Sequence, residues 1–331
     1  MDKKKSRSPW RMCALPACAC TVLLFSTQAF AQGGFPTRPV RMVNPYTPGG
    51  SVDLVCRAIS SGLSEVWKQQ VIVDNRPGAG TQIGSEIVVR AEPDGYSVLC
   101  TSSAIAIIPS MYRSMRFDPA TDLQPIILAT TSPSLLVVHP GLPVKSVKEL
   151  ISLAKSQPGQ IAAASSGVGT TTHLKLEMFK SMAKIDLLHV PYKGGGPAIA
   201  DLMGGQVKVF FNTPGTLIPH VSSGRLRALA ITSSKRADYL PDIPTLSEAG
   251  VPGFEAYIWY GIYGPKTLPT GLIEQWNRSV DAFLKSQQAQ DYYRRVYMTT
   301  AGGTPATFAA FHKSETARWG GIIKAAGIKP Q

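Results

Sequence analysis

Two glycine-rich segments combine small residues, hydroxyl groups and backbone freedom in a way that suits anion binding. The first runs from Asn44 to Asp53 (NPYTPGGSVD) and the second from Ser165 to His173 (SSGVGTTTH). Each follows a short apolar run and precedes an amphipathic one, a pattern that predicts a strand, a loop and a helix. Backbone N–H groups and the positive end of the helix dipole would meet at each loop and attract a carboxylate. Two such loops could hold one anion from both sides.

In the first loop, glycine lets the backbone turn sharply and approach a ligand closely. Ser51 or Asp53 can cap or charge the first turn of the following helix. An ordinary tight strand–helix connection also favours glycine, so that structural interpretation stays open beside the functional one. The candidate ligand-binding residues of this loop are Tyr46, Thr47, Pro48, Gly49, Gly50 and Asp53.

The second loop carries five hydroxyl side chains around two glycines, and these groups can bind carboxylate oxygens directly or through water. A well-capped helix start is the alternative. His173 lies just inside the predicted helix, where packing or capping explains it more simply than ligand contact. Glu177 follows four residues later, but the sequence shows no third metal ligand, so we expect no metal site. The candidate ligand-binding residues here are Ser165, Ser166, Gly167, Gly169, Thr170, Thr171 and His173.

Further candidate ligand-binding residues follow other predicted strands. Asn212 and Thr213 follow the strand predicted at residues 207–211, and a plain turn explains them equally well. These candidates are Ser102, Ser103, Tyr192, Gly194, Asn212 and Thr213.

Enzyme motifs are missing from the sequence. There is no G-x-S-x-G nucleophile elbow and no G-x-x-x-x-G-K-[ST] phosphate loop. The segment from Gly78 to Gly84 misses the dinucleotide fingerprint by one position, so we interpret it as a turn and a helix start. The five histidines stand apart in the sequence without metal-type spacing. We therefore expect a binding protein without catalytic residues or cofactor, and a secreted hydrolase is a weak alternative.

The first 31 residues have the features of a secretory signal peptide. A basic start precedes a short apolar stretch, and Ala29-Phe30-Ala31 forms an A-x-A site that predicts cleavage before Gln32. Beyond the leader, 29 basic and 20 acidic residues give a net charge of +9 (29 − 20), and the basic residues are scattered, so this part of the chain lacks the basic stripe that nucleic acid binding requires. Of the five cysteines, Cys56 and Cys100 lie beyond this leader. A disulfide and two buried thiols both remain open for that pair.

Strand-like and helix-like runs alternate along most of the chain, which predicts parallel sheets covered by helices. Two long strand-like runs, at residues 125–139 and 255–263, are suited to cross between two lobes. The helices expected include 53–68, 81–91, 147–156, 171–183, 198–203 and 272–285, with limits uncertain by a few residues.

Ordered matches along nearly the whole chain beyond the leader resemble the tripartite tricarboxylate transporter substrate-binding proteins, the Bug family. The segments that carry this resemblance include 45–53 (PYTPGGSVD), 73–80 (VDNRPGAG), 93–96 (PDGY), 166–170 (SGVGT), 189–194 (HVPYKG), 201–207 (DLMGGQV) and 240–245 (LPDIPT).

The resemblance implies an α/β fold of the two-lobed periplasmic binding protein kind (type II, Venus-flytrap), with a hinge of crossing strands. It also implies a small carboxylate ligand held by the loops at 46–53 and 165–171, integral membrane transporter subunits as partners, and a periplasmic monomer. We expect a signal peptide at 1–31, one lobe from 32–130 and 253–331, and a second lobe from 131–252. A receptor of the same fold that serves a membrane sensor kinase is the alternative function.

Overall fold

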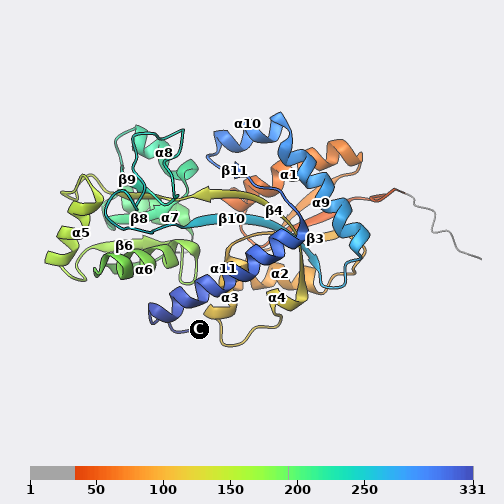
Figure 1. The fold of residues 1–331 in the computed structure, drawn as a ribbon, viewed down its shortest axis with the longest axis horizontal. Helices are drawn as coiled ribbons and strands as arrows, with labels where there is room; N and C mark the ends of the chain where they lie inside the picture. The colour runs from red at the N-terminus through yellow and green to blue at the C-terminus, as the bar shows by residue number, and fades with distance from the viewer. Residues whose placement is uncertain (1–33, 193, 331) are drawn as a thin grey trace, which may run out of the picture. The chain divides into compact units, whose positions relative to one another are not determined.

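The computed structural model describes residues 34–192 and 194–330, and the predicted signal peptide lies outside them. All elements named below belong to the unit formed by residues 36–331. Its strands form two separate sheets, which Figure 1 shows with helices around them. None of the helices in the described residues has the length and apolar character that a membrane crossing requires.

The first sheet, which we call sheet A, has a parallel half and an antiparallel half. β1 is apolar and almost fully buried, as parallel strands covered on both faces usually are. Across the sheet the strands are β11 (Thr299–Thr300), β4 (Leu123–Pro133), β10 (Tyr257–Pro265), β3 (Ser97–Ser102), β1 (Val40–Asn44) and β2 (Val71–Asn75).

In the second sheet, sheet B, four strands run in one direction and β5 (Leu135–Val138) runs antiparallel to both of its neighbours. Across the sheet these are β7 (Leu188–Pro191), β6 (Ala162–Ser165), β8 (Val209–Asn212), β5 (Leu135–Val138) and β9 (Arg227–Ile231). One core cluster packs α5 (Val147–Ser156) and α6 (Thr171–Ala183) against this sheet together with residues of α11 (Pro305–Ala325). Another packs α7 (Gly195–Met203) and α8 (Pro214–Ser222) against it.

Helices connect the strands of both sheets. Those between or after strands of sheet A are α1 (Ser51–Trp67), the short η1 (Ala79–Thr81), α2 (Gln82–Val89), α3 (Ala104–Met111), α4 (Pro119–Asp122), α9 (Thr270–Lys285), α10 (Gln287–Arg295) and α11 (Pro305–Ala325). Those that connect strands of sheet B are α5 (Val147–Ser156), α6 (Thr171–Ala183), α7 (Gly195–Met203) and α8 (Pro214–Ser222).

Two chain crossings join the sheets. The long apolar run predicted to cross is two strands, β4 in sheet A and β5 in sheet B, with Ser134 between them. The return crossing lies just before β10, where the Ala256 amide donates to the Thr232 carbonyl. The Ser134 amide in turn donates to Thr232 Oγ1 at 2.7 Å, so hydrogen bonds tie the two crossings together. This arrangement is the hinge of crossing strands that the sequence predicted.

Cys56 of α1 and Cys100 of β3 form a disulfide, which resolves the two alternatives left by the sequence. Both residues are fully buried. The bond fixes the helix that follows the first glycine-rich loop to the middle of sheet A.

Candidate functional site

Every group of predicted site residues lies at the carboxyl end of a parallel strand. In sheet A the first loop follows β1, and Ser102 and Ser103 end or follow β3. In sheet B the second loop follows β6, while the other two groups follow β7 and β8. Ligands of open α/β sheets bind outside this edge of the strands. The structure therefore gathers the predicted residues at one edge of each sheet.

The two edges meet at the hinge. Pro133, at the end of β4, pairs with Tyr257 on the edge of sheet A that carries the first loop. Two residues later Leu135 pairs with Asn212 on the edge of sheet B that carries the second loop. Segments from the two sides also touch, because Gly169 lies against the side chain of Met111 on α3. Both loops therefore follow strand ends on the side of each sheet that borders the hinge.

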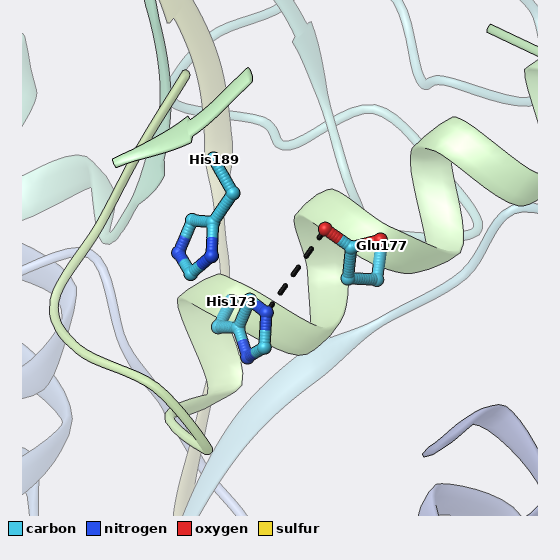
Figure 2. Close-up of side chains that lie close together, drawn as sticks. All are labelled: His173, Glu177 and His189. Atoms are coloured by element: carbon cyan, nitrogen blue, oxygen red, sulfur yellow. Dashed lines mark ion pairs between the residues drawn. The ribbon is translucent and has the colours of Figure 1, made fainter. Parts of the chain in front are cut away.

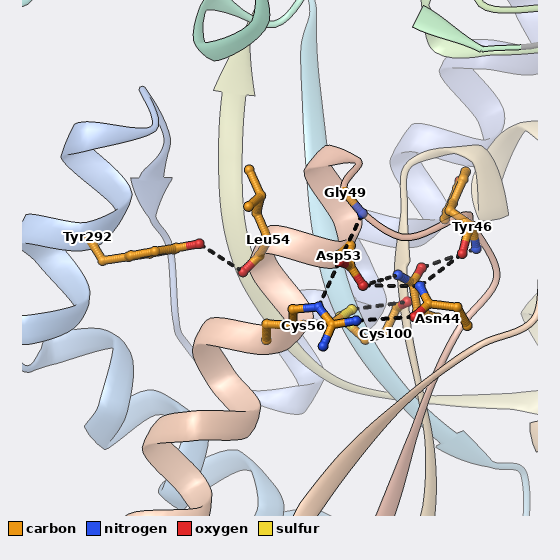
Figure 3. Close-up of polar contacts among 10 residues, drawn as sticks. Asn44, Tyr46, Gly49, Asp53, Leu54, Cys56, Cys100 and Tyr292 are labelled. Atoms are coloured by element: carbon orange, nitrogen blue, oxygen red, sulfur yellow. Dashed lines mark hydrogen bonds and ion pairs between the residues drawn. A yellow bond between two sulfur atoms is a disulfide. The ribbon is translucent and has the colours of Figure 1, made fainter. Parts of the chain in front are cut away.

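A network around one buried carboxylate shapes the first loop (Figure 3). Asp53 Oδ2 accepts hydrogen bonds from the Gly49 amide at 3.0 Å and from Arg57 Nε at 2.7 Å. Its Oδ1 accepts from Asn75 Nδ2 at 3.0 Å and from Asn44 Nδ2 at 3.4 Å. These four hydrogen bonds join Asp53 to the loop and to neighbouring residues, so the carboxylate holds the loop in place.

The electrostatics of this loop follow from those contacts. Burial by itself would raise the pKa of Asp53, but hydrogen bonds from Arg57, Gly49 and Asn75 outweigh it and hold the pKa below its usual value. Tyr46 donates or accepts a 2.6 Å hydrogen bond with Ser102 Oγ, and burial raises the pKa of its phenol to about 12. Ser103 is fully buried, and its hydroxyl has no partner among the described residues.

Neutral groups shape the second loop. Thr170 caps α6 by accepting from the His173 amide, and its hydroxyl also donates to the Gly167 carbonyl at 2.6 Å. The Ser166 amide donates to Thr172 Oγ1 at 2.8 Å, and the Gly169 amide donates to His173 Nδ1 at 3.2 Å. The hydroxyls of Thr170 and Thr172 therefore already hold the loop. The backbone amides of the helix start are left as candidate ligand donors.

His173 and His189 stack beneath this loop, which corrects the expectation that the histidines stand apart. Their ring centroids are 4.1 Å apart, and His189 Nε2 lies 2.6 Å from Ser165 Oγ (Figure 2). Burial is the main cause that lowers the pKa of each ring to about 4, so both are neutral near pH 7. The sequence missed this pair because its members lie on different elements, α6 and β7.

His189 also supplies the third potential metal ligand that the sequence did not show, beside His173 and Glu177. The hydrogen bonds argue for a different role. His173 Nδ1 accepts the Gly169 N–H, so the neutral ring carries its proton on Nε2, the atom that lies 4.0 Å from Glu177 Oε1. Lys180 Nζ already lies 3.1 Å from that same oxygen. The cluster fits a support for the second loop better than a metal site.

Backbone donors remain available at both edges. Within the described residues, the amides of Ser51 and Val52 in α1, and of Thr171 and Thr172 in α6, donate no hydrogen bond to a loop or side-chain acceptor. First-turn amides have no acceptor inside their own helix, and the helix dipole adds partial positive charge there. The two helix starts can therefore bind an anion without a dedicated cationic side chain.

A cavity of about 580 Å³ lies elsewhere along the hinge, lined by Tyr239, Tyr257, Arg294 and Thr300 among others. It borders β4 and β11, whereas the first loop follows β1. Three strand spacings separate β4 from β1, which corresponds to roughly 14 Å. None of the residues that line this cavity belongs to either glycine-rich loop.

Comparisons with known proteins agree with this geometry. Residues 55–328 match the family described as "Tripartite tricarboxylate transporter family receptor". The chain is 36% identical over 310 residues to a UPF0065 protein of Pseudomonas sp. strain P51, covering 93% of this chain and 92% of that protein. A structure of R. palustris Rpa4515 with adipate is 37% identical, with a TM-score of 0.85, and the match covers 90% of this chain and 100% of that one. The periplasmic binding protein BugD is 33% identical, with a TM-score of 0.82, over 90% of this chain and 100% of that one.

Proposed function

Because the chain belongs to the tripartite tricarboxylate transporter receptor family and has its two-lobed fold, we propose that it captures a small organic carboxylate. In this proposal the protein works in the periplasm and delivers the ligand to integral membrane transporter subunits. The lobes comprise residues up to about 130 and from 253 onward on one side, and 131–252 on the other. The protein binds its ligand without transforming it.

One observation carries the proposal: the amide-rich starts of α1 and α6 lie on sheet edges that meet at the hinge. A carboxylate between them would accept hydrogen bonds from both lobes. Contact with one lobe is possible in an open form, whereas contact with both requires closure. Ligand binding would therefore shift the population toward the closed form.

The available interactions are large enough for this shift. Each helix start contributes about 0.3–1 kcal/mol, and up to ~2 kcal/mol where it is partly buried. Each charge-assisted hydrogen bond adds roughly 1.5–3 kcal/mol. Moving a two-state equilibrium from about 1:99 to 99:1 requires ~5.5 kcal/mol of differential binding. Two helix starts and a few hydrogen bonds supply that amount.

Thermal-shift and calorimetric titration of the purified protein test the proposal. The panel contains adipate, which the R. palustris structure holds, together with citrate, benzoate, an amino acid and a neutral sugar. We expect a carboxylate to raise the unfolding temperature, because a ligand that binds only the folded state stabilises it. Stabilisation by the sugar alone, or by no member of the panel, would contradict the proposal.

Gly50→Val locates the site. Gly50 has extended backbone, and a Cβ there would meet only the Thr47 carbonyl, at 3.7 Å, so folding should tolerate the change. The branched side chain would crowd the start of α1 and weaken carboxylate binding about tenfold or more. Gly271→Val is the matched control, because Gly271 lies in the first turn of α9 with open space around it. Equal affinities in the two variants would place the site elsewhere.

A further inference from the structure

Lys175 of α6 is fully buried but has no carboxylate partner. Its Nζ donates to Ser134 Oγ at 2.7 Å, and no other acceptor contacts it within the described residues. An ammonium group has three donors, so two are left without a protein acceptor. Lysine is almost never fully buried unless it is paired. The folded protein therefore buries an amine for which its described residues supply one hydrogen-bond acceptor and no carboxylate.

The charged groups around Lys175 do not neutralise it. Across from it, on α11, are Glu315 and Arg318. Glu315 is already engaged: its Oε2 accepts from Trp259 and Trp319, and its Oε1 accepts from Arg318. Burial, followed by the Arg318 charge, lowers the pKa of Lys175 to about 7, and Glu315 opposes this only in part.

Charges on the same helix are also accounted for. His173 is neutral because burial lowers its pKa to about 4. Glu177 and Lys180 form an ion pair with each other at 3.1 Å. Neither the facing helix nor the helix of Lys175 thus supplies a spare negative charge.

Lys175 is placed among the elements of the proposed site. Its partner Ser134 precedes Leu135, which pairs with the predicted site residue Asn212. On α6, Lys175 lies four residues after Thr171, a rise of about 6 Å along the helix axis and nearly the same face. The ammonium group therefore lies at the hinge side of the edge that carries the second loop.

We propose that Lys175 determines ligand specificity by providing the counter-charge for a second anionic group of the ligand. The site then prefers a dicarboxylate to a monocarboxylate of equal length. The loops hold one carboxylate through amides, and Lys175 attracts the other from the hinge side. This inference rests on the proposed function, because it concerns the same site.

Calorimetric titration with adipate and hexanoate tests this role, because the two ligands share chain length and differ by one carboxylate. We expect Lys175→Met to weaken adipate binding about tenfold or more, and hexanoate binding less than about threefold. Lys155→Met, at an exposed position on α5, is the matched control and should change neither affinity. Equal losses for both ligands, or no loss for adipate, would overturn the proposal.

The pH dependence of binding adds a readout that a purely structural role would not move. Lys175 is charged below its pKa of about 7, so adipate affinity of the unmodified protein should fall as pH rises from about 6.5 to 9. The ligand carboxylates stay ionised over this range. The Lys175→Met profile should be flat, and an unchanged slope in that variant would contradict the proposal.

Proton uptake by the unmodified protein provides a test that does not depend on folding of a variant. Titrations at about pH 8 in buffers of different ionisation enthalpy should show more protons taken up with adipate than with hexanoate. Equal uptake would overturn the role of Lys175 but leave the receptor function intact. Failure of the unmodified protein to bind either ligand, or any carboxylate in the panel, would instead contradict the proposed function.

Discussion

The two glycine-rich loops share a strand–loop–helix design but differ in what holds them. The loop after β1 surrounds the charged Asp53–Arg57 pair, and a disulfide fixes its helix to β3. The loop after β6 depends on hydroxyls and on two neutral stacked imidazoles. In both loops several side chains hold the loop geometry, and the helix-start amides are candidate donors to the ligand.

The difference predicts different sensitivities. A carboxylate with a lowered pKa keeps its charge down to low pH. A buried neutral histidine with a lowered pKa reduces the stability of the folded state once pH falls below about 6.5, because the unfolded chain then binds a proton that the folded chain does not. The first loop should therefore keep its structure in mild acid and lose stability when the disulfide is reduced. The second loop should lose stability in mild acid and be insensitive to reduction.

Removal of the disulfide should have the largest effect on stability. Replacing Cys56 and Cys100 together by serine frees a loop with a sequence separation of 44 residues. We expect a loss of about 2–4 kcal/mol in the free energy of unfolding, measured by denaturant titration. Carboxylate affinity should change little in conditions where the variant is folded. A loss below about 0.5 kcal/mol would show that the bond does not stabilise this side.

Asp53→Ala should have the next largest effect. It removes the acceptor for the Gly49 amide, for Arg57 and for Asn75, and leaves those donors without their partner. We expect about 2 kcal/mol of destabilisation together with weaker ligand binding. Glu65→Gln, at an exposed position of the same helix, is the control and should stay within about 0.5 kcal/mol of the unmodified protein. Ligand binding unaffected by Asp53→Ala would separate this loop from the site.

Mild acid should loosen the second loop before the first. The pKa values of His173 and His189 are lowered to about 4 in the folded protein, below the usual value near 6.5. Their stabilising contribution is complete above about pH 6.5 and is lost progressively as pH falls from there toward 4. Hydrogen exchange at pH 5 should show lost protection at residues 165–172 while residues 46–53 stay protected. Simultaneous loss in both loops would contradict the comparison.

Thr170→Ala should have the smallest effect. It removes the side-chain cap of α6, for which we expect a loss of about 1 kcal/mol in the free energy of unfolding. The cap at α1 is Gly50, which makes no side-chain hydrogen bond, so Gly50→Ala should change stability less. A larger effect at Gly50 than at Thr170 would reverse the assignment of what holds each loop.

The sequence predicted the local elements well where hydrophobic period and turn residues agree. Helices α5 and α6 have the predicted limits, and both glycine-rich loops begin their helices as expected. α8 was missed because Pro214 and Pro219 resemble a turn, although proline is compatible with the first turn of a helix. α3 was missed for a related reason, since it contains Pro109.

The interior of the candidate site could not be predicted in the same way. The order of strands and loops in the sequence indicated which loops lie together, because the carboxyl ends of parallel strands lie on one side of a sheet. It could not indicate that His189 stacks on His173, or that Lys175 reaches Ser134, since these contacts join separate elements. Contacts of that kind depend on how helices pack on a sheet rather than on any local pattern.

A structure of the protein with its tightest-binding carboxylate tests the central claim most directly. We predict that one carboxylate group contacts amides at the start of α1 and at the start of α6 in the same complex. A ligand bound in the cavity beside β4 and β11, or held by only one of the two helix starts, would contradict it.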